Sequence, residues 1–336
     1  MELYILGGHQ KKSLVRADDA EHRFESAVII RLDTETNHSE QVVVYKTMAE
    51  AKADHEASNL FASGTLHANK LYACTYTEVL ILELPLFKRV GYISLPRFNA
   101  IHHVCPTQKG TLLIANTGLD MVVETTLEGT VLHEWNVLGD DPWKRFSKNV
   151  DYRKIASTKP HQSHPNFVFQ LGDDVWVTRF HQRDAVCLTK PDQRIPLFIG
   201  RPHDGLLYRG MLYFTAVDGH LIEADPESLQ LTSTWDLKAL RGDARAVLGW
   251  CRGVAFVDSS RVWIGFTRIR KTSALENLNW IKHGFRALDC PTHIALFDVA
   301  KNKFLKQIDL ESRGVNILFS IHTTGRIDPS CVSIPA

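Results

Sequence analysis

The sequence lacks the features that mark several large classes of protein. Its 39 lysines and arginines are balanced by 38 aspartates and glutamates, so the net charge is +1. That balance leaves no polybasic surface for nucleic acid and no acidic tail. The longest apolar runs, such as 79–86, are far shorter than the roughly 20 residues that a membrane-spanning helix needs. We therefore expect no nucleic-acid partner and no membrane partner.

Signal, cysteine and nucleotide motifs are also missing. The amino-terminal stretch MELYILGGHQKK lacks the basic start and long apolar run of a secretory signal, so we expect a cytoplasmic protein. The six cysteines form no CxxC pair, which argues against a disulfide framework and a zinc knot. GxGxxG, GxxxxGK, GxSxG and HExxH are absent, so we expect no nucleotide cofactor, no α/β-hydrolase and no zincin protease.

What the sequence does contain is a long series of short strand patterns. Segments such as SAVIIRLD, EVLILEL, DVWVTRF and RVWIGF are rich in Val, Ile and aromatic residues. Gly, Asp, Asn and Pro separate them, and helical patterns are few. The chain is therefore predicted to be all-β.

The strand patterns repeat. Six segments fit one template of strand, polar turn and second strand, and they begin near residues 63, 102, 164, 203, 251 and 313. Setting aside a segment at 140–162 leaves a period of about 40 residues, which is the length of one four-stranded propeller blade. The last repeat supplies a single strand, and the strand patterns at the amino terminus supply the missing three. This predicts a ring closed by a C-terminal inner strand with N-terminal outer strands.

We therefore predict a six-bladed β-propeller, formed as a single domain over residues 1–336. Two insertions, at about 140–162 and 268–292, are expected over the funnel face of the ring. Seven blades or a two-sheet sandwich are the alternatives, although a sandwich gives no reason for the repeat. The insertions suit either a lid over a polar ligand or a contact surface for a second subunit, so a homo-oligomer is compatible with the sequence.

The repeat gives a location to part of the histidine content, which is 16 residues. Inner strands of a propeller all begin at one face, so His103, His164 and His203 are predicted to share one channel mouth. Three neutral imidazoles with an open position would hold one divalent metal ion, such as Zn, Mn, Mg or Ca. The alternatives are a metal-free site in which one histidine acts as acid or base, and a purely structural role.

Arginines form a second group on the same face. Forked guanidinium groups bind carboxylate or phosphate, so an anionic ligand is expected from Arg179, Arg183, Arg252, Arg268 and Arg270. The alternative is ordinary loop arginine paired with Asp184 or Asp218. Further substrate-binding candidates at this rim are His181, Asp218, Trp280 and Cys251. The Cys251 thiol is either a nucleophile or a small buried apolar group.

Four motifs carry a resemblance to known proteins. Through GWCRGVAF, RPHDGLLY, KPHQSHPNFVF and ANTGLDMVVE, residues 100–325 resemble a group of bacterial propeller-like proteins of unknown function. This resemblance implies the propeller and no established activity. The architecture is more distantly similar to that of gluconolactonase and strictosidine-synthase-like propellers, whose Glu, two Asn and Asp metal ligands do not map onto this chain. Virginiamycin-lyase-type and oligogalacturonate-lyase-type propellers use histidines, but no individual residue carries over.

Two functions follow from the predicted funnel. The first is an enzyme, a lyase, isomerase or hydrolase, that acts on a small polar anionic molecule. His164 or His203 would be the general base, and Arg179 and Arg252 would hold the anion. The second is a non-enzymatic propeller that binds a metabolite or a partner protein, since this fold hosts both.

Overall fold

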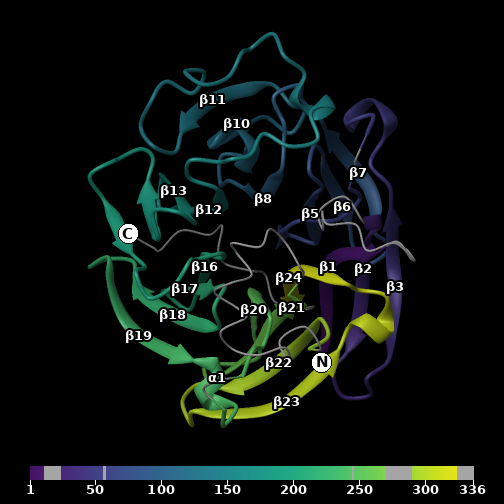
Figure 1. Cartoon of the computed structure of the whole chain (residues 1–336), viewed down its shortest axis with the longest axis vertical. Helices are drawn as coiled ribbons and strands as arrows, with labels where there is room; N and C mark the ends of the chain where they lie inside the picture. Colours follow the sequence, from purple (N-terminus) through teal and green to yellow (C-terminus); the bar gives the residue numbers. More distant parts are fainter. Residues whose placement is uncertain (11–23, 56–57, 244–245, 270–289, 324–336) are drawn as a thin grey trace.

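Six four-stranded antiparallel sheets form a ring (Figure 1), and the centre of the ring, where the innermost strands lie, is called the channel below. The computed structural model describes residues 1–10, 24–55, 58–243, 246–269 and 290–323. The strand order in every sheet runs from the channel outward, and almost all of the regular structure is strand. The predicted six-bladed β-propeller is therefore confirmed.

The first three blades include the one that closes the ring. Blade 1 contains β24 (Ile317–Thr323), β1 (Glu2–Gln10), β2 (Phe24–Asp33) and β3 (Ser39–Tyr45). Blade 2 contains β4 (Gly64–His67), β5 (Lys70–Cys74), β6 (Val79–Glu83) and β7 (Lys88–Ile93). Blade 3 contains β8 (Ile101–Pro106), β9 (Leu112–Asn116), β10 (Met121–Thr125) and β11 (Val131–Asn136).

The other three blades follow in chain order. Blade 4 contains β12 (Pro165–Leu171), β13 (Asp174–Arg179), β14 (Asp184–Cys187) and β15 (Arg194–Pro196). Blade 5 contains β16 (Leu206–Tyr208), β17 (Met211–Ala216), β18 (His220–Asp225) and β19 (Gln230–Asp236). Blade 6 contains β20 (Trp250–Phe256), β21 (Arg261–Thr267), β22 (His293–Asp298) and β23 (Lys303–Asp309).

Helices are short and lie between strands. The described ones are η2 (Ala49–Ala51), η3 (Thr117–Leu119), η4 (Tyr152–Lys154), α1 (Leu237–Leu240) and η6 (Glu311–Arg313). None of the helices in this described part of the chain has the length and apolar character needed to cross a bilayer.

Ring closure joins the two ends of the described chain. β24 pairs antiparallel with β1, for example Ile5 with Ile321, so the innermost strand of blade 1 comes from the C-terminal side of the chain. Figure 1 shows β24 beside β1 near the centre of the ring. The predicted closure is confirmed, because the inner strand β24 comes from the C-terminal side of the chain and the other three strands of blade 1 from the N-terminal side.

Threonine hydroxyls join neighbouring blades near the channel. The hydroxyl of Thr65 on β4 donates to the carbonyl of Val104 on β8, at 2.8 Å. Thr178 on β13 and Thr267 on β21 donate in the same way to carbonyls of the next blade, each at 3.0 Å. These buried bonds between blades sit beside apolar clusters that fill the space between neighbouring sheets. These threonine hydrogen bonds fix the inner strands of neighbouring blades, and the side chains on those strands, relative to one another.

Candidate active site at the channel mouth

The inner strands of five blades bring side chains together at one mouth of the channel. His102 is on β8, His164 directly precedes β12, His203 lies shortly before β16, Arg252 is on β20 and Phe319 is on β24. The His102 ring centre lies 4.8 Å from that of His164 and 6.5 Å from that of His203. Phe319 lies 6.0 Å from the His102 ring and 6.1 Å from the His203 ring, and the Arg252 guanidinium lies 4.5 Å over its face. Three imidazoles and one guanidinium are thus grouped near the aromatic ring of Phe319.

Backbone bulges place several of these side chains. The register of β8 against β9 shifts between Ile101 and His103, so His102 is the extra, unpaired residue. The register of β24 against β1 shifts in the same way at Phe319, and that of β20 against β21 shifts at Arg252. A bulge redirects the side chain that it carries and is common beside functional sites. The three bulges occur in three different blades at the same level of the ring.

His102 is held as a neutral imidazole. Its Nδ1 atom lies 2.8 Å from the backbone carbonyl of Ala100, which only accepts hydrogen bonds, so Nδ1 carries the proton. Burial lowers the pKa of His102 to about 3, and the nearby His203 and Arg252 add to that effect. At neutral pH its Nε2 atom is therefore a lone-pair acceptor.

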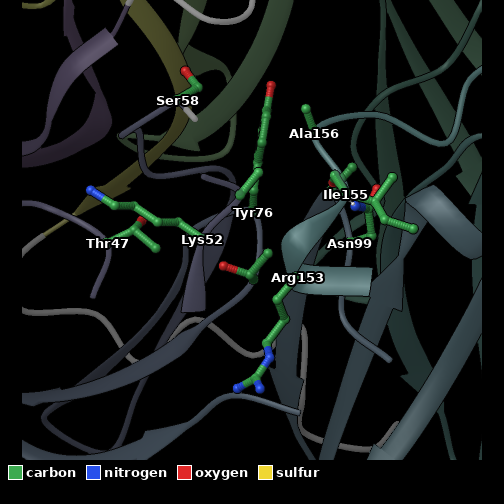
Figure 2. A pocket seen from close by; sticks show the side chains of 11 residues that line it. Thr47, Lys52, Ser58, Tyr76, Asn99, Arg153, Ile155 and Ala156 are labelled. Atoms are coloured by element: carbon green, nitrogen blue, oxygen red, sulfur yellow. Dashed lines mark hydrogen bonds between the residues drawn. The ribbon is translucent and has the colours of Figure 1, made fainter. Parts of the chain in front are cut away.

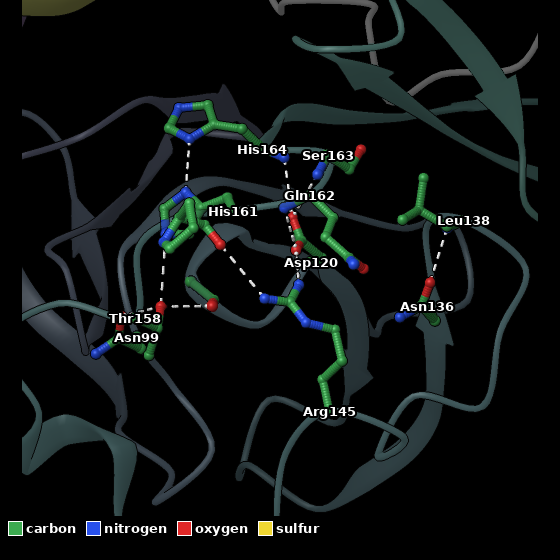
Figure 3. A network of polar contacts seen from close by, with 12 residues as sticks. Asn99, Asp120, Asn136, Leu138, Arg145, Thr158, His161, Gln162, Ser163 and His164 are labelled. Carbon is green, nitrogen blue, oxygen red and sulfur yellow. Dashed lines mark hydrogen bonds and ion pairs between the residues drawn. The ribbon is translucent and has the colours of Figure 1, made fainter.

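His164 is held in a conformation that the chain does not adopt readily. Its φ is +59°, although it is not glycine and it precedes Pro165. Such a backbone persists only where the surroundings enforce it, and it is common at functional sites. Here the carboxylate of buried Asp120 accepts hydrogen bonds from three successive backbone N–H groups, those of Gln162, Ser163 and His164, at 2.8 to 2.9 Å (Figure 3). Asp120 is thus the anchor of the turn that presents His164.

The insertion at 140–162 completes this anchor. Arg145 within it donates from Nη1 to Oδ2 of Asp120 at 2.7 Å, which balances the charge of the buried carboxylate. The insertion is also fixed to the rim of blade 3, because the amide of Asn99 donates to the carbonyls of Tyr152 and Ile155. Residues of the 140–162 segment therefore contribute to the anchor of His164.

His161, from the same insertion, contacts His164 directly. The two Nδ1 atoms lie 2.8 Å apart, so one ring donates and the other accepts (Figure 3). Burial lowers the pKa of His164 well below the usual range, with further contributions from the neighbouring His102 and His161. His164 is thus neutral in the unliganded channel.

His203 rests on a buried carboxylate. Its Nδ1 atom lies 3.6 Å from Oδ1 of Asp204, and the other Asp204 oxygen accepts from the Thr215 hydroxyl and from the Gly253 N–H. Burial opposes ionisation of Asp204, but His203 and these donors outweigh it and hold the pKa of Asp204 below its usual value. Burial and Arg252 lower the pKa of His203, while Asp204 opposes that shift. An ionised carboxylate therefore lies beneath a neutral imidazole.

His103, the third member of the expected trio with His164 and His203, makes contacts of a different kind. The His103 ring stacks on Phe167 at 3.6 Å, its Nδ1 accepts from the Val168 N–H, and its Nε2 lies 3.2 Å from the Thr65 hydroxyl. Both ring nitrogens are therefore used between blades. The bulge at His102 is the cause, because it turns His102 rather than His103 toward His164.

Two of the expected anion-binding arginines are paired instead. Arg179 forms a two-pronged ion pair with Asp184, at 2.8 and 2.6 Å, and also donates to the Val137 carbonyl. Arg268 forms a two-pronged ion pair with Glu311, at 2.7 and 2.6 Å. Buried Arg179 therefore connects the two ends of the turn between β13 and β14 through Asp184, and its role in anion binding stays a prediction.

The other predicted substrate-binding residues differ in exposure and in the contacts that they make. His181 is exposed, with its ring 6.2 Å from that of His164, and Arg183 is exposed in the turn between β13 and β14. Asp218 lies 3.0 Å from Nδ1 of His220. Cys251 is fully buried, and burial raises the pKa of its thiol well above the usual range, which disfavours the nucleophilic thiolate. Arg270 and Trp280 lie outside the described residues, as does most of the 268–292 insertion.

Two further observations concern possible binding sites for a metal ion or a ligand. Within the described ranges, no group of three or more His, Cys, Asp or Glu side chains is arranged to hold a metal ion. A separate cavity of about 30 Å³ is lined by residues that include Tyr76, Asn99 and Arg153 (Figure 2).

Sequence reasoning missed some of the residues that build the site. His161 and Phe319 were not among the candidates, and His102 was passed over for its neighbour. His161 carried a signal, since the motif HQSH places two histidines three residues apart before an inner strand. Nothing in the sequence marks Phe319, because its position depends on the bulge in β24.

Fold and site together define a six-bladed β-propeller with a histidine-lined channel mouth. Neither a family model nor a curated protein matches the sequence. Among solved structures, a protein of unknown function from Bacteroides caccae is similar with a TM-score of 0.59 and 12% identity, over 96% of this chain and 98% of that chain. A chain of a nidogen/laminin complex gives 0.54 and 9%, over 95% and 97%. A streptogramin B lyase structure gives 0.50 and 11%, over 95% and 91%. At these identities the likeness extends to the fold alone.

Proposed function

We propose that this protein is an enzyme that transfers protons to or from a small polar, anionic molecule bound at the channel mouth. The observation that carries the proposal is the gathering of His102, His164 and His203 from three successive blades. Neutral imidazoles are effective proton acceptors near neutral pH, and they become acids once protonated. The reaction is an elimination, an isomerisation or a hydrolysis, all of which need such a proton transfer.

Charge at the mouth favours an anionic substrate. Arg252 lies beside the histidines, and its positive charge lowers the pKa values of His102 and His203. The carboxylates nearest to these rings have partners of their own, since Asp120 is paired with Arg145 and Asp204 accepts from Thr215 and Gly253. A bound anion would offset the charge of Arg252 and raise the pKa of a neighbouring imidazole toward the useful range.

His164 and His203 are assigned as the acid–base pair, with Arg252 binding the anion and stabilising negative charge that develops on it. His102 takes the third position that His103 was expected to fill. A divalent metal, the other version of this site, would have to be bound by His102, His164 and His203 after side-chain rearrangement. Metal analysis of the purified protein tests that version, and a stoichiometric divalent ion would replace the metal-free mechanism.

The test follows proton exchange without knowledge of the full reaction. The protein is incubated in D2O with a panel of small carboxylates and phosphate esters, and C–H signals are followed by 1H NMR. We expect exchange or conversion of at least one compound, reduced about 10²- to 10⁴-fold in His164→Gln and His203→Gln. His38→Gln is the matched control, because His38 is exposed in the turn between β2 and β3, which the topology places at the opposite face.

Other outcomes favour the alternative functions. Binding of panel compounds without exchange or conversion would favour a non-enzymatic propeller that binds a metabolite. Unfolding of both histidine variants, detected by circular dichroism, would favour a structural role for these residues. Unchanged activity in both folded variants would refute the proposed acid–base pair.

A further inference from the structure

Neighbouring polar groups determine which ring nitrogen carries the proton in each of the three channel histidines. For His102 the partner of Nδ1 is the Ala100 carbonyl, which fixes the proton on Nδ1. For His203 the group nearest to the buried Nδ1 is the Asp204 carboxylate, at 3.6 Å. At that distance His203 Nδ1 forms no hydrogen bond, but an ionised carboxylate favours N–H over a lone pair facing it.

The tautomer of His164 follows from a longer chain of contacts. Thr158 has one hydroxyl hydrogen and two carbonyl acceptors, the Gly118 oxygen at 2.5 Å and the Asn99 side-chain oxygen at 3.2 Å. Both are nearer than Nε2 of His161, which lies 3.4 Å away. The hydroxyl hydrogen therefore goes to a carbonyl, and the Thr158 oxygen accepts from His161 Nε2.

The rest of the chain is then determined. With its proton on Nε2, neutral His161 has a lone pair on Nδ1, which faces Nδ1 of His164 at 2.8 Å (Figure 3). His164 must therefore donate from Nδ1, and its own lone pair lies on Nε2. His161 acts as a positioning residue, because it sets the tautomer of His164 without being required to touch a ligand.

All three imidazoles thus present acceptors, and no described residue supplies a hydrogen-bond donor to any of the three Nε2 atoms. A carboxylate or phosphate oxygen would meet lone pairs there and be repelled. A hydroxyl group would donate to them. The ring spacings of 4.8 and 6.5 Å are within the span of one small molecule that carries several hydroxyls.

From this arrangement we propose that the channel mouth binds a small hydroxylated acid, whose hydroxyl groups donate to Nε2 of His102, His164 and His203. Its acidic group lies toward Arg252, as in the proposed function on which this assignment rests. A hydroxyl bound to a histidine lone pair is also the group from which that histidine can take a proton.

The first test measures the tautomers without any ligand. Long-range 1H–15N NMR at pH 7.5 separates Nδ1–H from Nε2–H imidazoles, and His102→Gln, His164→Gln and His203→Gln assign the three signals. We expect Nδ1–H in all three rings, and Nε2–H in any of them would overturn the proposal. His161→Ala should move His164 toward Nε2–H, whereas His161→Asn, whose side-chain oxygen replaces the Nδ1 lone pair, should retain the wild-type tautomer. A His164 signal that does not change in His161→Ala would overturn the role of His161.

The second test compares acids that differ only in a hydroxyl group. Malate against succinate and lactate against propionate are matched pairs, and binding is measured by titration calorimetry up to millimolar concentration. We expect the hydroxylated member of at least one pair to bind at least tenfold more tightly, and His164→Gln to remove that difference. Equal binding within both pairs, or no binding by either hydroxy acid, would overturn the proposal.

The two tests separate this proposal from the proposed function. Preferential binding of the hydroxy acid without proton exchange would sustain the ligand class and refute the enzyme. Proton exchange on an acid that lacks hydroxyls would do the reverse.

Discussion

Oδ1 of Asp120 accepts a hydrogen bond from the backbone N–H of His164 at 2.9 Å, across 44 residues of chain. Asp120 belongs to the turn before β10 in blade 3, whereas His164 opens blade 4. One buried carboxylate thus connects two blades and sets the backbone of a candidate catalytic residue. The same carboxylate depends on Arg145 for its counter-charge.

Asp120→Ala should destabilise the protein and release His164. The variant loses four donors to a buried carboxylate and leaves Arg145 unpaired, so we expect a loss of about 3 to 5 kcal/mol in the free energy of unfolding. Urea denaturation measures this loss. Asp173→Ala is the control, because Asp173 and its partner Lys109 are both exposed, and it should change stability by about 0.5 kcal/mol or less. An Asp120→Ala loss no larger than that of the control would contradict the anchoring role.

Arg179→Met should destabilise the fold and spare the ligand site. Removal of the guanidinium leaves Asp184 buried without its partner, which costs about 3 to 5 kcal/mol in similar pairs. We expect the double variant Arg179→Met, Asp184→Asn to recover part of the loss, measured in a double-mutant cycle by urea denaturation. Ligand binding should be unchanged in both, and a selective loss of anion binding in a stable Arg179→Met protein would restore the anion-binding prediction.

Stability should fall when the pH drops below about 6.5, the usual pKa of histidine. Burial lowers the pKa of His103 to about 3 and that of His322 to about 4, so the unfolded chain takes up protons that the folded chain refuses. Each such histidine makes its full contribution to the free energy of unfolding above pH 6.5. Below that pH the contribution declines by about 1.4 kcal/mol per pH unit, toward pH 4. His322→Gln should flatten the decline measured by urea denaturation, whereas exposed His38→Gln should leave it unchanged. A stability that is flat from pH 7 to 5 would contradict the neutral buried histidines.

Cys251 should resist alkylation in the native state. It is fully buried, and burial raises the pKa of its thiol, so neither access nor thiolate is available. Treatment with iodoacetamide at pH 8, followed by peptide mass spectrometry, should label Cys251 only after denaturation. Cys251→Ala should keep ligand binding, and rapid native labelling together with loss of binding would reinstate it as a nucleophile candidate.

The period of the strand patterns predicts the ring. The sequence does not show where the register of a strand shifts by one residue. Repeats of about 40 residues and the single strand in the last repeat led to six blades and to the pairing of β24 with β1. Which of His102 and His103 faces the channel depends on a bulge in β8. In a strand, a slip of one residue moves a side chain to the opposite face, and single-sequence patterns do not locate bulges.

Partners across a turn explain the arginine result. Arg179 and Asp184 lie at the two ends of the turn between β13 and β14, where they pair in register. The sequence placed both at the correct face and left the pairing open, because only the turn geometry decides whether Asp184 or a ligand meets the guanidinium. The same holds for Arg268, whose partner Glu311 is 43 residues further along the chain.

The pairing of β24 with β1 sets an order of events during synthesis. β1 leaves the ribosome early, but its inner neighbour is made after the other five blades are complete. Phe319 is therefore synthesised after His102, His164, His203 and Arg252. The candidate site is complete only when the ring closes, so a translation product that ends before β24 would contain the histidines without the Phe319 ring beside them.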